Sequence, residues 1–171
     1  MEGADALGLV AEIGIAIAGF AGVIATLRAP GGRIGAYAAM RIGNLLAYSA
    51  LAVLLALVPF GLHFAGLTNA AVWTLSSSAM TALVAAVFLG TVQIGYARGA
   101  LPAIEDRAPG QRLFIPYAIA MPTGIIVLQL ANAALVHQVW PFYLGLLALT
   151  AHSLFLFAYI LFAPSRAEVK P

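Results

Sequence analysis

One acidic side chain lies inside a long apolar stretch near the N-terminus. The segment LVAEIGIAIAGFAGVIATL, residues 9–27, carries no charge apart from Glu12. If a helix crosses a membrane from Leu7 onward, Glu12 lies about 8 Å below the membrane surface, at 1.5 Å per residue. A charge at mid-bilayer costs about 3 kcal/mol on insertion scales, so such residues usually face other protein and mark ion or proton pathways. Glu12 is therefore the first candidate for chemistry, and it is expected to point into a bundle or an oligomer seam.

Hydroxyl and amide side chains in two later apolar stretches fall at a depth similar to that of Glu12. The candidates for one shared polar layer are Ser76, Ser77, Ser78, Thr81, Gln129 and Asn132. Gln129 and Asn132 are three residues apart and therefore share a helix face. Two interpretations stay open. The layer is either an ion, proton or small-solute site with Glu12 as its titratable member, or a set of hydrogen bonds that hold helices together.

The three histidines suggest weaker candidates. His152 falls near mid-bilayer in the last apolar stretch, where it is either a proton-relay member or ligand, or a neutral side chain bonded to a neighbouring helix, which we favour. His63 and His137 fall at matched depth, but both lie at loop edges. A metal or haem site needs paired ligands on facing helices, and nothing else in the sequence supports one, so no metal and no cofactor are predicted.

The composition places the chain among integral membrane proteins. It has 171 residues, of which 63% are hydrophobic and only 8% charged, whereas soluble domains are about a quarter charged. The net charge of +2 rests on eight scattered basic residues, which excludes a nucleic-acid surface. There is no cysteine, and therefore no disulfide and no thiolate chemistry. The length suits one transmembrane domain over residues 1–171.

Five stretches have the roughly 20 apolar residues that a membrane-spanning helix needs. We therefore predict an all-α helix bundle with five spans, at residues 7–27, 42–63, 70–96, 114–136 and 140–162. The break HQVWP between the last two is the weakest boundary. A bundle of four spans with one re-entrant segment stays an alternative.

The basic residues predict the orientation, because lysine and arginine concentrate in cytoplasmic loops. With five spans, all of them fall on one side of the membrane: Arg28, Arg33, Arg41, Arg98, Arg107, Arg112, Arg166 and Lys170. The N-terminus is then outside, while the loop 98–113 and the tail 164–171 are cytoplasmic. Four spans would separate the charges of the tail from those of the first loop.

Small residues in the first span predict close helix packing. Gly14, Ala18 and Gly22 recur every four residues, and Gly19 lies on the same side as Glu12. Such residues let helix backbones approach one another in a membrane. Because one bundle of this size has little interior for a pathway, we expect a homo-oligomer or a place in a larger membrane complex.

Parts of the first, second and last spans resemble small, functionally uncharacterised bacterial multi-pass inner-membrane proteins. The segments concerned are EIGIAIAGFAGVIATL, RIGNLLAYSALAVLLALVP, WPFYLGLLAL and FLFAYILF. The resemblance implies a multi-pass protein of the bacterial inner (plasma) membrane. It assigns no activity and no role to any residue.

Two functions compete on this evidence. The first is a small oligomeric channel or transporter for ions, protons or small solutes, with Glu12 as its key group, Ser77, Thr81, Gln129 and Asn132 as lining residues, and His152 as a further candidate. The second is a non-catalytic structural or accessory subunit of a larger membrane complex. The sequence lacks GxxxxGK[ST], HExxH, GxSxG and CxxC motifs, which disfavours an enzyme. The expected partners are membrane lipids and other membrane subunits. The transported species, the stoichiometry, the gating and the partner's identity are not encoded in any motif.

Overall fold

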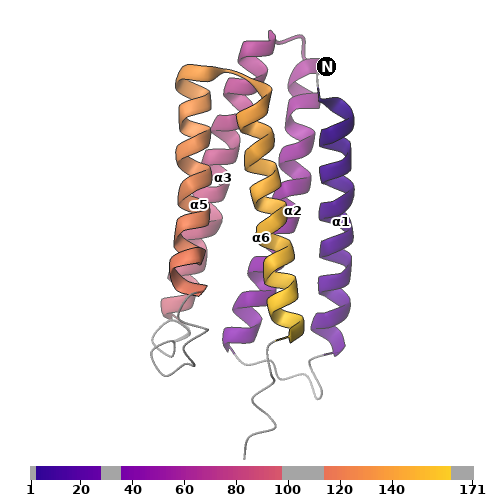
Figure 1. The fold of residues 1–171 in the computed structure, drawn as a ribbon, viewed down its shortest axis with the longest axis vertical. Helices are drawn as coiled ribbons and strands as arrows, with labels where there is room; N and C mark the ends of the chain where they lie inside the picture. Colours follow the sequence, from indigo (N-terminus) through magenta and orange to yellow (C-terminus); the bar gives the residue numbers. More distant parts are fainter. Residues whose placement is uncertain (1–2, 28–35, 98–113, 163–171) are drawn as a thin grey trace, which may run out of the picture.

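The described part of the chain is a bundle of long helices (Figure 1). The computed structural model describes residues 3–27, 36–97 and 114–162. Its elements are α1 (Ala4–Leu27), α2 (Ala36–Phe64), α3 (Asn69–Ala97), α5 (Phe114–Ala131), the π-helix η3 (Asn132–Val136) and α6 (Val139–Phe162). No strand occurs within these ranges. The predicted loop 98–113 and tail 164–171 lie outside them.

These elements form five helices that are long and apolar enough to cross a membrane, with α5 and η3 together making one of them, which confirms the five predicted apolar helices. The chain is therefore a membrane protein by the length and composition of its helices. The HQVWP break, on which the four-span alternative depended, is a tight connection through His137 and Gln138 between two full-length helical segments. Two neighbouring helices overrun their predicted starts, since α1 begins at Ala4 and α2 at Ala36.

Helix α6 lies at the centre of the bundle. Helices α1, α2, α3 and α5 follow one another in an arc, and α6 contacts all four of them (Figure 1). The large side chains that α6 buries in the core are Phe142, Leu146, Leu149, Leu156 and Ile160. Helices α1 and α5 end up at opposite edges of the bundle. We call the end where α1 begins the N-terminal end, and the opposite one the loop end.

The two connections at the N-terminal end are short and use left-handed backbone. Gly66 has φ +79° between α2 and α3, a conformation that glycine adopts without steric cost. Thr68 directly precedes α3, and its Oγ1 accepts a hydrogen bond from the backbone N–H of Ala71 in the first turn at 3.4 Å. His137 has φ 55° between η3 and α6, which is uncommon for a residue with a side chain. Specific contacts described below hold this second connection.

Helices α1 and α2 approach each other closely at Gly14. A Cβ atom at this position would lie 2.7 Å from Cγ2 of Val53 and 3.2 Å from the backbone oxygen of Ser49. The predicted small-residue face of α1 therefore packs, at this residue, against a helix of the same chain. At Gly22 and Gly19 a Cβ would meet nothing within 4 Å, and Ala18 is half-buried.

We expect Gly14→Leu to lower the thermal unfolding midpoint in detergent, because the larger side chain forces α1 away from the backbone of α2. Overpacking of this kind costs about 1–3 kcal/mol. Gly22→Leu on the same helix is the control, since its side chain enters open space. Equal midpoints for the two variants would contradict the α1–α2 packing described here.

Candidate functional site

The polar residues at the N-terminal end form a cluster around Asn132. Its side-chain Nδ2 donates to Oγ of Ser77 on α3 at 2.8 Å and to the backbone oxygen of Gln138 at 2.9 Å. Its Oδ1 accepts from the backbone nitrogen of Gln138 at 3.0 Å. The side-chain amide of Asn132 thus bonds both the backbone N–H and the backbone oxygen of Gln138. These two bonds fix the turn between η3 and α6.

Gln129, about one helical turn before Asn132, supports the same turn between η3 and α6. Its Nε2 donates to the backbone oxygen of Pro141 on α6 at 2.8 Å. The amide packs directly on Gly145, where an added Cβ would clash with Gln129 Nε2 and lie 2.6 Å from Sδ of Met80. Gln129 and Asn132 are both fully buried. We call Ser77, Gln129, Asn132, Gln138 and Pro141 the turn cluster.

Two further hydrogen bonds surround the turn cluster near the bundle end. Thr74 on α3 is hydrogen-bonded to Nδ1 of His137 at 2.8 Å, and Nε1 of Trp140 donates to Oε1 of Gln138 at 2.9 Å. The first of these links α3 to the residue with left-handed backbone. Together with the turn cluster they explain how a histidine can keep φ 55° there.

The sequence-based prediction of a polar layer is therefore met in part. Asn132 and Ser77 are hydrogen-bonded to each other, and Gln129 lies on the turn before Asn132 and bonds the backbone of Pro141 instead. Ser76 and Thr81 are in the same helix, but the buried hydroxyl of each has no hydrogen-bond partner among the described residues. Ser78 is exposed, and its hydroxyl donates to the backbone oxygen of Thr74 in its own helix.

Glu12 does not belong to the layer. It is exposed, and at about 100° per residue it lies about 160° around α1 from Gly14, which packs on α2. The buried face of α1 consists of Leu7, Val10, Ala11, Gly14, Ile17 and Ala21. The prediction that Glu12 turns into the bundle and joins the layer is wrong for the single chain. An interface between chains at Glu12 stays a prediction.

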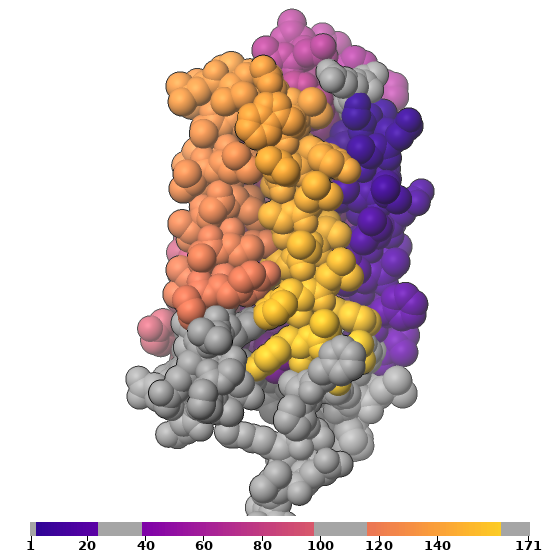
Figure 2. Space-filling view, in the orientation of Figure 1, coloured from indigo at the N-terminus to yellow at the C-terminus, as the bar shows by residue number. Residues whose placement is uncertain are grey.

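We define the outer face of α1 as Gly8, Glu12, Ala16 and Gly19. Glu12, Ala16 and Gly19 are exposed, and Gly8 is partly so. No atom lies within 4 Å of a Cβ built on Gly8 or Gly19. Helix α1 is the column at one edge of the molecule in Figure 2, with α6 beside it. The outer face is therefore open to whatever surrounds the bundle.

A second buried polar cluster lies deeper, around His152 of α6. Its Nδ1 shares a 3.3 Å hydrogen bond with the hydroxyl of Tyr117 on α5. The ring of Tyr48 on α2 stands nearly perpendicular to the imidazole, with 4.7 Å between ring centroids. His152 is thus held by its neighbours in the way that the structural interpretation of this residue expected. Its seven-residue separation from Gly145 puts about 10 Å between the two clusters along α6.

Sequence reasoning missed the partners of His152. Neither Tyr117 nor Tyr48 was paired with the histidine. Counting residues from the helix ends gives their level along the bundle, but not the rotation of α2 and α5 that turns both rings toward α6.

Nearer the loop end, Arg41 stacks on Tyr159 at 3.8 Å from the ring centroid, and Thr91 donates to Oδ1 of Asn44 at 2.8 Å.

The described residues hold no group of three or more His, Asp or Glu side chains that could bind a metal ion. His63 is exposed near the end of α2, while His137 is bonded to Thr74. His152 lies far below both along the bundle and contacts tyrosines instead of acidic side chains or histidines. These placements offer no donor set for a metal within the described ranges.

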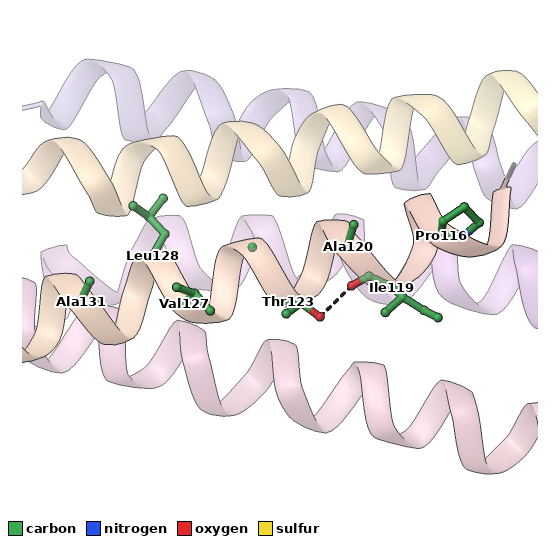
Figure 3. Close-up of a pocket in the computed structure, with 8 residues that line it drawn as sticks. Pro116, Ile119, Ala120, Thr123, Val127, Leu128 and Ala131 are labelled. Carbon is green, nitrogen blue, oxygen red and sulfur yellow. Dashed lines mark hydrogen bonds between the residues drawn. The ribbon is translucent and has the colours of Figure 1, made fainter.

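An apolar groove runs along α5 (Figure 3). It is open to the outside of the bundle, and its lining residues are Pro116, Ile119, Ala120, Thr123, Gly124, Val127, Leu128 and Ala131. The one hydroxyl in this lining, Thr123 Oγ1, donates to the backbone oxygen of Ile119 at 2.8 Å. The groove therefore presents hydrocarbon surface, which suits a lipid chain or another apolar helix.

Comparison with known protein-family models, curated proteins and solved structures found no match. The function is therefore argued from the placement of the side chains alone.

Proposed function

We propose that this chain is a non-catalytic subunit of an assembly within the membrane and that it joins its partners through the outer face of α1. The observation that carries the proposal is the placement of Glu12 on the exposed side of an apolar helix. A charge at mid-bilayer costs about 3 kcal/mol, and a carboxylate that faces lipid at the shallower depth of Glu12 carries a smaller penalty of the same kind. A partner that covers Glu12 with hydrogen-bonding groups removes most of that cost.

The interior of the bundle supports a structural role. The buried amide of Asn132 bonds the backbone of Gln138 in the turn before α6. The buried amide of Gln129 bonds the backbone oxygen of Pro141 in the first turn of α6. Large apolar side chains fill the level between the turn cluster and His152, among them Leu146 and Leu149. Residues that hold a turn together are poorly placed to exchange bonds with a passing solute.

The assembly is tested by the particle mass of the protein extracted from membranes with its surrounding lipid. We expect a particle whose protein mass exceeds the 17.7 kDa of one chain, and we expect Gly19→Leu to reduce that mass by blocking the outer face. Gly61→Leu is the matched control, because Gly61 is also an exposed helical glycine with nothing within 4 Å of its Cβ. A particle of single chains in the wild type contradicts the proposal, as does an equal effect of the two variants.

A second candidate function is passage of protons or ions along the seam between subunits. It is favoured by the same exposed carboxylate, which lies further into the apolar part of α1 than Asp5, the other acidic side chain on that side of the helix. Flux into proteoliposomes that is present in the wild type and lost in Glu12→Gln supports this function. Absence of flux in both proteins, with the assembly intact, leaves the structural subunit as the function.

The cellular setting is part of the proposal. We infer the bacterial inner membrane, with the N-terminal end outside and the loop end in the cytoplasm, because every basic residue of the chain then lies on one side. Lipids surround the bundle, the α5 groove offers them a binding surface, and the proposed role requires no cofactor.

A further inference from the structure

We propose that a second copy of this chain covers the outer face of α1 and that the two Glu12 side chains meet across a two-fold axis. This inference rests on the assembly proposed above and names its partner. The proposed site consists of one carboxyl group from each copy. It would hold the pair by a hydrogen bond between carboxyl groups, of which at least one carries a proton.

The depth of Glu12 favours a second copy as its partner. Glu12 lies eight residues from the start of α1, about 12 Å along the helix. Copies of one chain insert into a membrane with the same orientation, so the two-fold axis of a dimer runs along the membrane normal. Two-fold dimers are the commonest symmetric assemblies, and a residue at their axis meets its own counterpart. The symmetry then places the two Glu12 side chains at the same depth in the membrane.

The chemistry of the carboxyl group also favours a second copy. The carboxyl group requires a charge or a hydrogen bond, and Arg41 is the one lysine or arginine among the described residues. Arg41 is buried near the loop end, where it stacks on Tyr159, and it is therefore not on a surface that a second copy could offer. A second Glu12 supplies both a donor and an acceptor once it is protonated. Within the described part of the chain, a second copy thus offers no exposed lysine or arginine to Glu12, whereas it does offer a second Glu12.

The groove along α5 is the competing surface on a second copy. Its one polar side chain, Thr123, already donates to the backbone oxygen of Ile119. Thr123 also lies thirteen residues from the end of η3, about 7 Å deeper than Glu12 by residue counting. A head-to-tail contact between α1 and this groove would therefore leave Glu12 against hydrocarbon.

Two glycines leave room for the two helices to approach each other. Gly8 lies one turn before Glu12, and Gly19 two turns after it, on the same face. Among the described residues, neither glycine has a neighbour within 4 Å of its Cβ position, so there is room for a second helix at these two positions. Small residues permit the close backbone contact that a hydrogen bond between two short side chains of Glu12 requires.

Cysteine cross-linking in membranes tests the inference directly, because the chain contains no cysteine of its own. We expect Ala16→Cys, one turn from Glu12, to form a disulfide-linked dimer on oxidation, since disulfides require Cα atoms within about 7 Å. Leu54→Cys on α2 is the control: it is exposed and ten residues from the same end of the bundle, and it should not cross-link. The inference would be overturned if Ala16→Cys formed no disulfide-linked dimer, or if Leu54→Cys formed as much dimer as Ala16→Cys.

The role of Glu12 is tested in the Ala16→Cys background. Glu12→Gln keeps a donor and an acceptor at the axis, so the dimer yield should stay within about twofold of the parent. Glu12→Leu removes both, and the yield should fall about tenfold or more, as expected for a loss of about 1.4 kcal/mol. An unchanged yield in Glu12→Leu would show that Glu12 does not hold the pair, and a loss in Glu12→Gln would indicate a basic partner instead.

The two proposals fail differently. If the extracted particle exceeds one chain and shrinks in Gly19→Leu, while Ala16→Cys forms no dimer, a different chain occupies the outer face of α1. The assembly then stands, and the second copy is wrong. If the extracted wild-type particle holds a single chain and Ala16→Cys forms no dimer, both are wrong.

Discussion

Gly145→Ala is expected to lower the stability of the bundle by about 3 kcal/mol. The added methyl group would clash with Nε2 of Gln129 and lie 2.6 Å from Sδ of Met80. The methionine side chain is flexible and can move, but the amide of Gln129 is buried and bonded to the backbone oxygen of Pro141. Displacing it combines an overpacking cost of about 1–3 kcal/mol with the loss of a buried hydrogen bond, about 1–3 kcal/mol when a partner is left unsatisfied.

The effect is measured by thermal or denaturant unfolding in detergent, beside Gly90→Ala on α3. Gly90 is a helical glycine with nothing within 4 Å of its Cβ position, so its substitution should leave stability unchanged or raise it slightly. In a Gln129→Ala background the Gly145→Ala cost should fall by more than half, because the group it displaces is absent. A cost that persists in that background would show that Gln129 is not what Gly145 accommodates.

Asn132→Leu is the second substitution with a large expected effect. It removes the three hydrogen bonds to Ser77 and Gln138, and side-chain hydrogen bonds within membranes average roughly 0.6 kcal/mol each. We therefore expect a loss of about 2 kcal/mol. Ser77→Ala removes one of the three bonds and should cost about a third as much.

The Asn132 prediction has a local readout as well as a global one. The backbone N–H of Gln138 donates to Oδ1 of Asn132, so its hydrogen exchange should accelerate in Asn132→Leu. Ser78→Ala is the control for both measurements, since the exposed Ser78 hydroxyl bonds only a carbonyl of its own helix. Unchanged exchange at Gln138 would contradict the assignment of Asn132 as the residue that holds the turn.

Depth was predictable from the sequence, and the direction of side chains was not. Counting residues along the five apolar stretches placed Ser77 level with Asn132, and the two are hydrogen-bonded. The same counting placed Glu12 level with them, yet Glu12 faces outward on the far side of α1. In a membrane both the core and the lipid accept apolar side chains, so hydrophobic periodicity does not tell the core face of a helix from its lipid face.

The contacts of His152 were out of reach for the same reason. Its place along α6 follows from the sequence, but its neighbours Tyr48 and Tyr117 belong to two other helices. Which residues meet it depends on how α2 and α5 are rotated about their axes. At Gly145 of α6, likewise, Gln129 of α5 and Met80 of α3 come close together, and no local sequence pattern predicts such a contact among three helices.

The measurement that tests the account most directly is the oxygen accessibility of a spin label at Ala16, compared with one at Leu54, in lipid bilayers. The two positions lie twelve and ten residues from the same end of the bundle and are both exposed in the single chain. If protein covers the outer face of α1, the label at Ala16 is shielded from oxygen while the label at Leu54 is not. Equal, high accessibility at both positions would mean that Glu12 faces lipid and that the assembly does not form.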